Sequence, residues 1–318
     1  MTDQPARGSA DDQPDDSRPI PWNVLWTRGG ATGEVAAMLS GGDPVRVEGD
    51  LREACVEARA DVLITKKLSS FDLVSAVVPH KVDLDGIRGV TAAVGSGPNS
   101  TLAAAVAHRI ATHFGIPGLL VTAPAPGGTE TAAQQLLDDI ALDAPGLDRL
   151  VQADGGARSI VEGLDPATLL VVGAPGGSWL HRQFFGPGRK LVLAAPAGAL
   201  VVRAAPIRCF QVATEPTYLG AVMRCADAVK VTTARVVPVV DDGELIGIAR
   251  RSALQASDPD TPVVEVMEPA VALEEDDALD AAWALAAFFE SAPIPVVAPD
   301  GSLVGTVDPR AVGIGRAP

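Results

Sequence analysis

The sequence of 318 residues has three cysteines, four histidines and no long hydrophobic run. The cysteines are odd in number, widely spaced and without a C-x-x-C pair, which argues against a disulfide framework and against a zinc site. We therefore expect Cys55, Cys209 and Cys225 to be buried thiols in a reducing compartment. The longest apolar stretch, residues 191–202, is too short for a membrane span, so we expect a cytoplasmic protein without membrane insertion.

Positive charge is also scarce, with 25 Lys and Arg against 40 Asp and Glu, a net charge of −15 and a pI of about 4.6. Binding to nucleic acid depends on clustered basic residues that neutralise phosphates, so we expect no nucleic-acid partner. Residues 1–20 contain five Asp and no apolar segment, and they predict a disordered acidic tail rather than a signal peptide or anchor.

From Trp22 onward, short apolar runs alternate with amphipathic segments, first over residues 21–88 and again over 89–204. This alternation is typical of βαβ units on a parallel sheet and predicts an α/β fold. Helix 101–114 is expected to begin after Ser100 as N-cap and to stop at Gly115. Its N-terminal end faces the loop 95–100 (GSGPNS), which suits a phosphate but is a weak signal alone.

Three glycines, Gly173, Gly176 and Gly186, start at the end of the expected strand 167–174 and have two and nine residues between them. In this strand-loop-helix context the spacing resembles the signature of universal stress proteins. The resemblance implies a Rossmann-like parallel sheet over 89–204, a shortened copy of it over 21–88, and binding of an ATP-type adenine nucleotide. Glycines allow backbone to approach a phosphate, and amides at a helix N-terminus point at the anion.

The candidate nucleotide-binding residues implied by this resemblance lie in two loops: Gly95, Ser96, Gly97, Ser100, Gly173, Gly176, Gly177, Ser178, Gly186 and Arg189. Two positions depart from the family pattern. Pro187 stands where nucleotide-binding members have Ser or Thr, and Gly95 stands where they have Asp. We expect the fold to be kept with altered or weakened nucleotide binding, and a degenerate loop without ligand is the alternative.

After Pro206 the pattern changes to an internal repeat, in which residues 237–250 match residues 294–308. In each copy an Asp-Gly pair, at 242–243 and at 300–301, predicts a tight hairpin. Residues 274–292 are expected to form an amphipathic helix with an acidic first turn. Residues 205–318 resemble a tandem pair of cystathionine-β-synthase-type (CBS) domains, which implies an α+β module with adenosine ligands of the AMP type.

In CBS domains a Ser or Thr and an Asp just after the glycine-containing strand hold the ligand. At the matching strand ends this chain has Arg250, Asp308 and Arg310, which we take as candidate phosphate contacts, while alanines occupy the expected carboxylate positions. The alternative is a solvated helix start with ordinary surface charge. The family resemblance also predicts a homodimer through the helix that carries Trp283, Phe288 and Phe289, and the alternative is that these aromatic side chains are core.

We find no nucleophile elbow, phosphate-binding P-loop or buried carboxylate pair, and therefore expect no enzymatic activity. The sequence favours a regulatory protein of stress-response type that senses an adenine nucleotide and controls a transporter, channel or enzyme. The alternative is an interaction scaffold with degenerate sites, and slow nucleotide hydrolysis ranks last.

Overall fold

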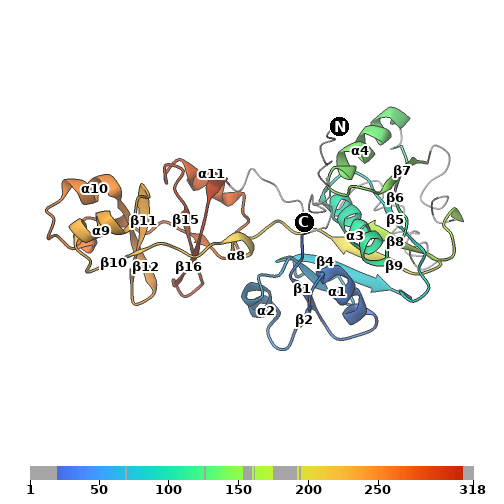
Figure 1. Cartoon of the computed structure of the whole chain (residues 1–318), viewed down its shortest axis with the longest axis horizontal. Helices are drawn as coiled ribbons and strands as arrows, with labels where there is room; N and C mark the ends of the chain where they lie inside the picture. The colour runs from blue at the N-terminus through green and yellow to red at the C-terminus, as the bar shows by residue number, and fades with distance from the viewer. Residues whose placement is uncertain are drawn as a thin grey trace, which may run out of the picture.

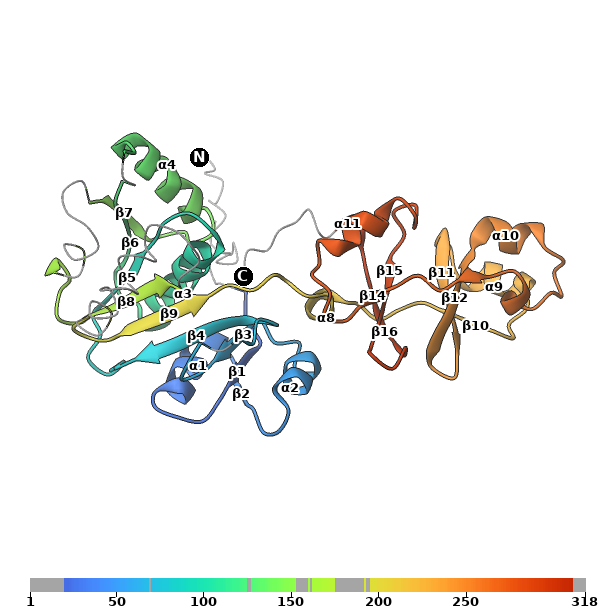
Figure 2. The same ribbon diagram turned by 180° about the vertical axis from the view of Figure 1, so that it is seen from behind.

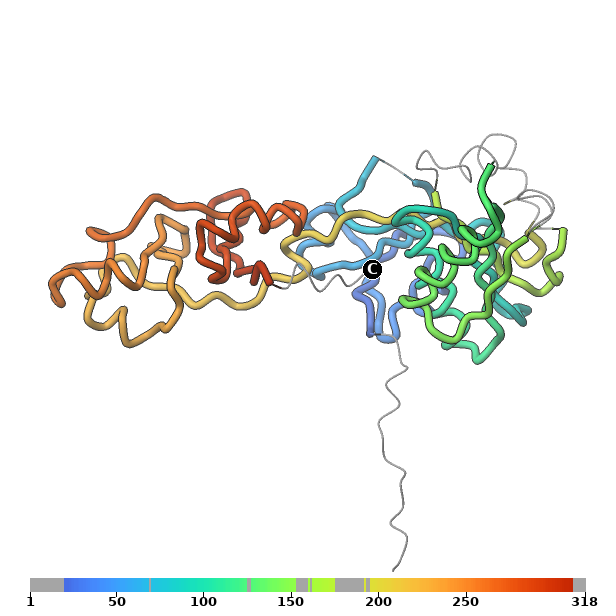
Figure 3. Tube along the Cα trace, turned by 90° about the horizontal axis from the view of Figure 1, so that it is seen from above, coloured from blue at the N-terminus to red at the C-terminus, as the bar shows by residue number. Residues whose placement is uncertain are grey.

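The computed structural model describes residues 20–68, 70–124, 127–152, 160, 162–174, 192 and 195–310. Figure 1 shows an elongated molecule, with a large sheet and its helices at one end and two small sheets in a row at the other. We call residues 20–204 the body and residues 207–310 the repeat module. A linker after the last strand of the body joins the two parts, which is also clear from above in Figure 3.

The body is built on one nine-stranded sheet. Its strands are β1 (Val24–Trp26), β2 (Val45–Arg46), β3 (Val62–Ile64), β4 (Ser75–His80), β5 (Gly89–Ala93), β6 (Gly118–Thr122), β7 (Asp148–Val151), β8 (Thr168–Gly173) and β9 (Ala199–Arg203). Its described helices with printed bounds are α1 (Thr32–Ser40), α2 (Leu51–Glu57), α3 (Pro98–Phe114) and α4 (Glu130–Ala141).

The strand order is β2-β1-β3-β4-β9-β8-β5-β6-β7, and every pair is parallel except β4 with β9. The predicted α/β fold with a mainly parallel sheet is confirmed. The antiparallel β4–β9 pair, with Val78 opposite Val201, joins the two predicted series edge to edge in a single sheet. Whether each series is a stress-protein copy with a boundary at residue 88 stays a prediction.

Both faces of this sheet are covered, as the continuous apolar runs of parallel strands require. Helices α1, α3 and α4 cover one face, where Leu102, Val106 and Ile110 of α3 share the main core. Alternate residues of each strand face opposite sides, so Leu169 lies in this core whereas Leu170 lies in a second cluster on the other face. All three cysteines are buried, as predicted.

The N-terminal end of α3 differs from the prediction. The helix begins at Pro98 with Gly97 as N-cap, whereas a start at 101 with Ser100 as N-cap was expected. Proline has no amide to donate and its fixed φ suits the first helical position, so Pro98 sets the start. The hydroxyl of Ser100 instead accepts a hydrogen bond from the amide of Gly95 at 2.9 Å. The predicted stop at Gly115, in left-handed conformation, is confirmed.

The repeat module contains two small sheets, of order β10-β11-β12-β13 and β14-β15-β16. Its elements are α8 (Cys209–Val212), β10 (Leu219–Gly220), α9 (Cys225–Val231), β11 (Val236–Asp241), β12 (Glu244–Arg250), α10 (Arg251–Ala256), η1 (Val263–Glu265), β13 (Glu268–Pro269), β14 (Leu273–Glu274), α11 (Ala281–Ala286), β15 (Ile294–Val297) and β16 (Leu303–Val307). We call residues 219–256 the first repeat and residues 273–310 the second repeat.

The two repeats have the same design down to the strand register. Both hairpins form as predicted, β11 with β12 and β15 with β16, and each has a register shift at the same place, after Val239 and after Val296. Each repeat is completed by the segment that precedes the other one. Strand β13, just before β14, pairs with β12 of the first repeat, and Thr214, just before β10, pairs with Thr306 of the second.

The acidic segment 274–292 is not the long helix that we expected. Helix α11 covers only Ala281–Ala286, Glu274 lies in β14, and Glu275 is buried with 5% of its surface exposed. The prediction was wrong because parallel pairing of β14 with β15 extends the chain here, and because a body arginine binds the two acidic side chains that follow. Helix propensity is easily overridden by such tertiary contacts.

Candidate functional site

The first candidate site lies at the carboxyl ends of β5 and β8. In an open parallel sheet a ligand crevice forms where the strand order reverses, and here β5 leads to β6 on one side while β8 lies on the other. The loop after β5 and the end of β8, at Gly173 and Ala174, therefore lie at this edge. Ser96 and Gly97 are exposed there, ahead of the N-terminal end of α3.

Asn99 ties these loops together. Its side-chain amide donates to the carbonyl of Ala174 at 2.8 Å, and its side-chain oxygen accepts from the amide of Ala204 at 2.8 Å. A Cβ on Gly173 would lie 2.9 Å from the Cβ of Asn99, so this close approach requires glycine at 173. Sequence reasoning missed Asn99, because an Asn in the first turn of a helix ordinarily signals only a cap.

The structure brings Gly95, Gly97, Ser100 and Gly173 together at this edge. Ser100 is buried and engaged with Gly95, so it acts within the loop rather than as an open donor. The remaining predicted loop residues lie outside the described residues: Gly176, Gly177, Ser178, Gly186 and Arg189. Their role stays a prediction.

The second candidate site is the end of β12, where Arg250 contacts both repeats. Its guanidinium donates to Glu268 at 2.7 Å and to Glu290 at 3.0 Å, and lies 5.2 Å from the ring centre of Phe288. Hydrogen bonding to Glu268, the main cause, together with the charges of both glutamates, raises the pKa of Arg250. This side chain is therefore a fixed cation between the two repeats.

Asp308 occupies the equivalent position at the end of β16. Arg310 donates to its carboxylate at 2.8 Å, and this hydrogen bond is the main reason that the pKa of Asp308 is lowered. Arg250 and the Asp308–Arg310 pair thus lie at corresponding strand ends, of β12 and β16, which we call the first junction and the second junction. No described contact joins them. Sequence reasoning missed Glu268 and Glu290, which precede β14 and follow α11, because no local pattern links them to Arg250.

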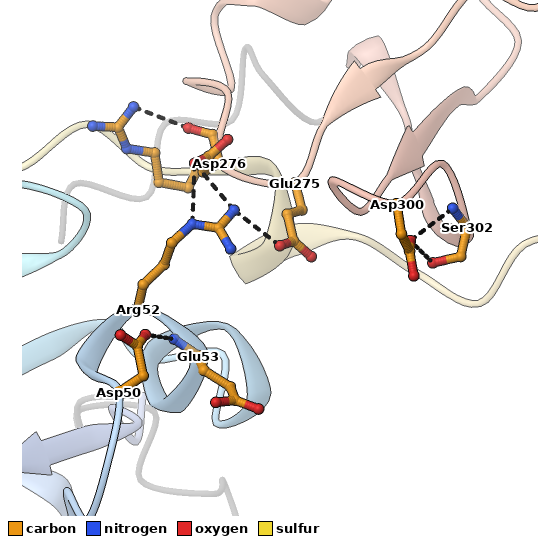
Figure 4. Close-up of polar contacts among 8 residues, drawn as sticks. Asp50, Arg52, Glu53, Glu275, Asp276, Asp300 and Ser302 are labelled. Carbon is orange, nitrogen blue, oxygen red and sulfur yellow. Dashed lines mark hydrogen bonds and ion pairs between the residues drawn. The ribbon is translucent and has the colours of Figure 1, made fainter.

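The body and the module meet at a charged contact, shown in Figure 4. Arg52 of α2 donates to Glu275 at 3.1 Å and to Asp276 at 3.2 Å. Burial alone would lower the pKa of Arg52, but the hydrogen bonds and charges of Asp276 and Glu275 outweigh it and raise the pKa. The predicted acidic first turn is therefore part of a contact between the body and the module.

Two further searches cover only the part of the chain that the structure describes. Within it, no group of three or more His, Cys, Asp and Glu side chains is placed to hold a metal ion. None of its helices combines the length and the apolar character needed to cross a bilayer.

Comparison with known protein families gives no match, and neither does comparison with curated proteins. Solved structures with similarity to about a third of the chain include CBS-domain pair proteins. The soluble part of a magnesium transporter is 20% identical over 34% of this chain and 47% of its own, with a TM-score of 0.30. This chain therefore spans about half the length of that structure.

A CBS domain pair/ACT domain protein of Thermotoga maritima is 19% identical over 34% of this chain and 96% of its own, with a TM-score of 0.32. The CBS-pair protein CBSX2 of Arabidopsis thaliana, solved in complex with AMP, is 18% identical over 31% of this chain and 91% of its own, with a TM-score of 0.28. Similarities at these identities and TM-scores assign neither a ligand nor a function to this chain.

Proposed function

We propose that this chain is a regulatory protein that senses an adenine nucleotide of the ATP or AMP type. Whether the nucleotide is bound then controls a partner protein. The observation that carries the proposal is Arg250, a fixed cation whose two carboxylate partners come from outside its own repeat. An anionic phosphate at Arg250 would compete with Glu268 and Glu290. Binding would therefore change the contact between the repeats, which is what a sensor needs.

The architecture of the body also supports a nucleotide-sensing function. The strand order β7-β6-β5-β8-β9 is that of a doubly wound nucleotide-binding fold, and the glycine-rich stretch begins at its switch point. We propose that this half is a universal-stress-protein-like domain and that the chain binds rather than converts its ligand. The proposed partner is a transporter, channel or enzyme, and the proposed assembly is a cytoplasmic homodimer.

A ligand-independent scaffold is the second candidate, and one specific observation favours it. In each of the three candidate regions a described polar side chain is already bonded within the chain: Ser100 to Gly95, Arg250 to two glutamates, and Asp308 to Arg310. A site whose groups are satisfied internally gains less from a ligand, because each new contact replaces an existing one.

A thermal-shift screen against ATP, ADP, AMP, cyclic di-AMP, NAD and S-adenosylmethionine separates the two. A ligand that binds only the folded state raises its stability in a dose-dependent way, by about 2.7 kcal/mol at a hundred times the dissociation constant. Loss of the shift in Arg250→Ala, Arg310→Ala or Arg189→Ala would place the ligand at the first junction, the second junction or the glycine-rich loop. Arg224→Ala, an exposed pair with Asp260, is the control.

The sensor proposal requires a saturable shift with at least one of these ligands. A shift that is unchanged in all three variants would move the ligand away from the candidate sites. Absence of any shift would favour the scaffold, and affinity isolation of protein partners would then be the next experiment.

A further inference from the structure

Helix α8 lies between two hydrophobic cores. Its Cys209 belongs to a core formed mainly by the second repeat, with Val236 and Ile248 of the first, whereas the next residue, Phe210, lies in a cluster of the body with Leu25 and Cys55. Phe210 keeps only 4% of its surface exposed. One short helix therefore takes part in the packing of both parts, and a shift of one core against the other must move it.

Hydrogen bonds fix α8 to the body as well. The side-chain amide of Gln211 donates to the carbonyl of Ala60 at 2.8 Å, and Arg59 donates to the carbonyl of Ala213 at 2.6 Å. The ion pair of Arg52 with Glu275 and Asp276, drawn in Figure 4, adds a charged contact between α2 and the second repeat.

All of these contacts involve α8 and the second repeat. Figures 1 and 2 show the second repeat between the body and the first repeat. Among the described residues, no hydrogen bond, ion pair or core contact joins residues 219–256 to the body. Among the described residues, the first repeat therefore reaches the body only indirectly, through the core that Val236 and Ile248 share with α8 and the second repeat.

A chain of bonds continues from α8 to the carboxyl edge of the large sheet. Ala204, the last residue of the body, donates to the side-chain oxygen of Asn99, whose side-chain amide also donates to the carbonyl of Ala174 after β8. The first linker amide, of Ala205, donates to the hydroxyl of Ser75 at 3.1 Å. The carbonyl of Ile207 then accepts from the amide of Leu279 in the second repeat at 2.8 Å.

In the other direction, α8 leads directly to the second junction. Thr214 exchanges two backbone hydrogen bonds with Thr306 of β16, at 2.9 and 3.0 Å. Gly305 lies so close to this segment that a Cβ there would be 2.9 Å from the Cβ of Ala213. Asp308 follows only two residues after Thr306.

We propose that residues 204–214 are a coupling segment that links the carboxyl edge of the nine-stranded sheet to the second repeat, and that the first repeat is coupled to the body only weakly, through the core that it shares with the second. The role of this segment in signalling rests on the function proposed above. The mechanical coupling itself needs no ligand, and it is tested on the unliganded chain. Amide exchange rates in single-site variants measure this coupling directly.

The repeats supply a matched pair of substitutions. Val239 and Val296 are both fully buried and stand at the same register shift in their repeats. Truncation to Ala loosens each repeat by a similar cavity. Hydrogen-exchange mass spectrometry of Val296→Ala is expected to show amide exchange about tenfold faster or more in residues 204–214 and 52–60. Val239→Ala should accelerate exchange in residues 219–256 and leave 204–214 unchanged.

Equal effects of the two substitutions on 204–214, or no effect of Val296→Ala there, would overturn the proposal. Arg52→Gln guards against a simple failure of Val296→Ala to fold, since Arg52 is partly exposed and its loss leaves every core intact. It should accelerate exchange at 207–214 and 275–279 but not at 219–256, and uniform or absent acceleration would again refute the coupling. A coupled chain that shows no thermal shift would refute the sensor alone.

Discussion

At the residue scale, the most consequential side chain is Glu275. It is buried, it lies in a segment whose composition suggests a solvated turn, and Arg52 is the charged partner that the structure gives it. Removal of one member of a buried pair is costly because the other charge stays out of water without compensation. Loss of the Arg52–Glu275 contact therefore destabilises the protein mainly because it leaves a buried carboxylate uncompensated. The net stabilisation by the intact pair is a smaller effect.

We expect Arg52→Ala to lower the free energy of unfolding by about 1–3 kcal/mol, less than for a fully buried pair because Arg52 is partly exposed. Urea denaturation of Arg52→Ala, Glu275→Ala and the double variant gives the coupling between the two side chains. Arg46→Ala is the control, because its pair with Glu48 is exposed on both sides and should contribute little. Equal losses in Arg46→Ala and Arg52→Ala would contradict the argument.

Gly305 gives a second residue-scale prediction. Gly305→Ala should destabilise the protein by about 1–3 kcal/mol, because its Cβ would meet Ala213 and the Thr214 carbonyl at 3.0 Å or less. Gly220→Ala is the matched control in a strand, since nothing lies within 4 Å of a Cβ there. Chemical denaturation of the two variants measures the difference, and a neutral Gly305→Ala would show that the α8 segment gives way easily.

The buried thiols predict how stability depends on alkaline pH. Burial, aided by the charge of Asp50, raises the pKa of Cys55 from 9.0 to about 12. Because the folded-state pKa is raised, the contribution of Cys55 to the free energy of unfolding is complete below about pH 9. It is lost as the pH rises toward 12, at up to about 1.4 kcal/mol per pH unit. Cys55→Ala should flatten the fall in unfolding free energy between about pH 9 and 10.5. Identical slopes in both proteins would refute the shift.

At the element scale, α8 decides how the two parts of the chain are joined. Four helical residues are too few to be stable alone, so the helix exists because both cores hold it. The antiparallel pairing of β4 with β9 also determines which strand edges stay open. Because β4 pairs with β9, neither series offers the edge at these strands to another molecule.

We expect Phe210→Ala to separate the unfolding of the body from that of the module. The substitution removes a buried ring at a cost of about 3–5 kcal/mol, and most of that loss falls on the contact between the parts. Differential scanning calorimetry should change from one cooperative transition to two. Val212→Ala is the control on the same helix, since Val212 is exposed. Two transitions already present in the unaltered chain would mean that α8 does not couple them.

At the scale of the whole molecule, exposed apolar side chains are concentrated on the repeat module. Trp283 is 56% exposed and Phe288 is 40% exposed, whereas Phe289, expected with them in the interface, is fully buried in the core. The predicted homodimer therefore has to use Trp283 and Phe288 rather than all three aromatics. Exposed aromatic side chains are typical anchors of protein interfaces.

Trp283→Ser should shift the chain from dimer to monomer in light scattering coupled to gel filtration, because truncation of a central aromatic anchor commonly costs 2 kcal/mol or more, roughly thirtyfold in affinity. Leu142→Ser is the control, since Leu142 is 80% exposed on the body, far along the chain from α11. A monomeric unaltered chain would refute the homodimer, and a dimer unaffected by Trp283→Ser would place its interface elsewhere.

The sequence by itself determined the features that depend on neighbouring residues. Alternating apolar segments gave the parallel α/β body, Asp-Gly pairs gave the two hairpins, and the repeat gave two equivalent junctions at Arg250 and Asp308. The buried thiols were also predictable, because a lone cysteine without a partner pattern behaves as a small apolar residue.

Only the tertiary structure decided the features that join distant parts of the chain. Arg52 and Glu275 are 223 residues apart, and Arg250 meets Glu290 across 40 residues, so neither contact has a local signal. For the same reason the sequence predicts a helix start at the acidic segment and gives no local signal for the role of Asn99. Propensity and spacing describe what a segment prefers alone, whereas burial of a charge or a carbonyl depends on which partner the fold brings to it.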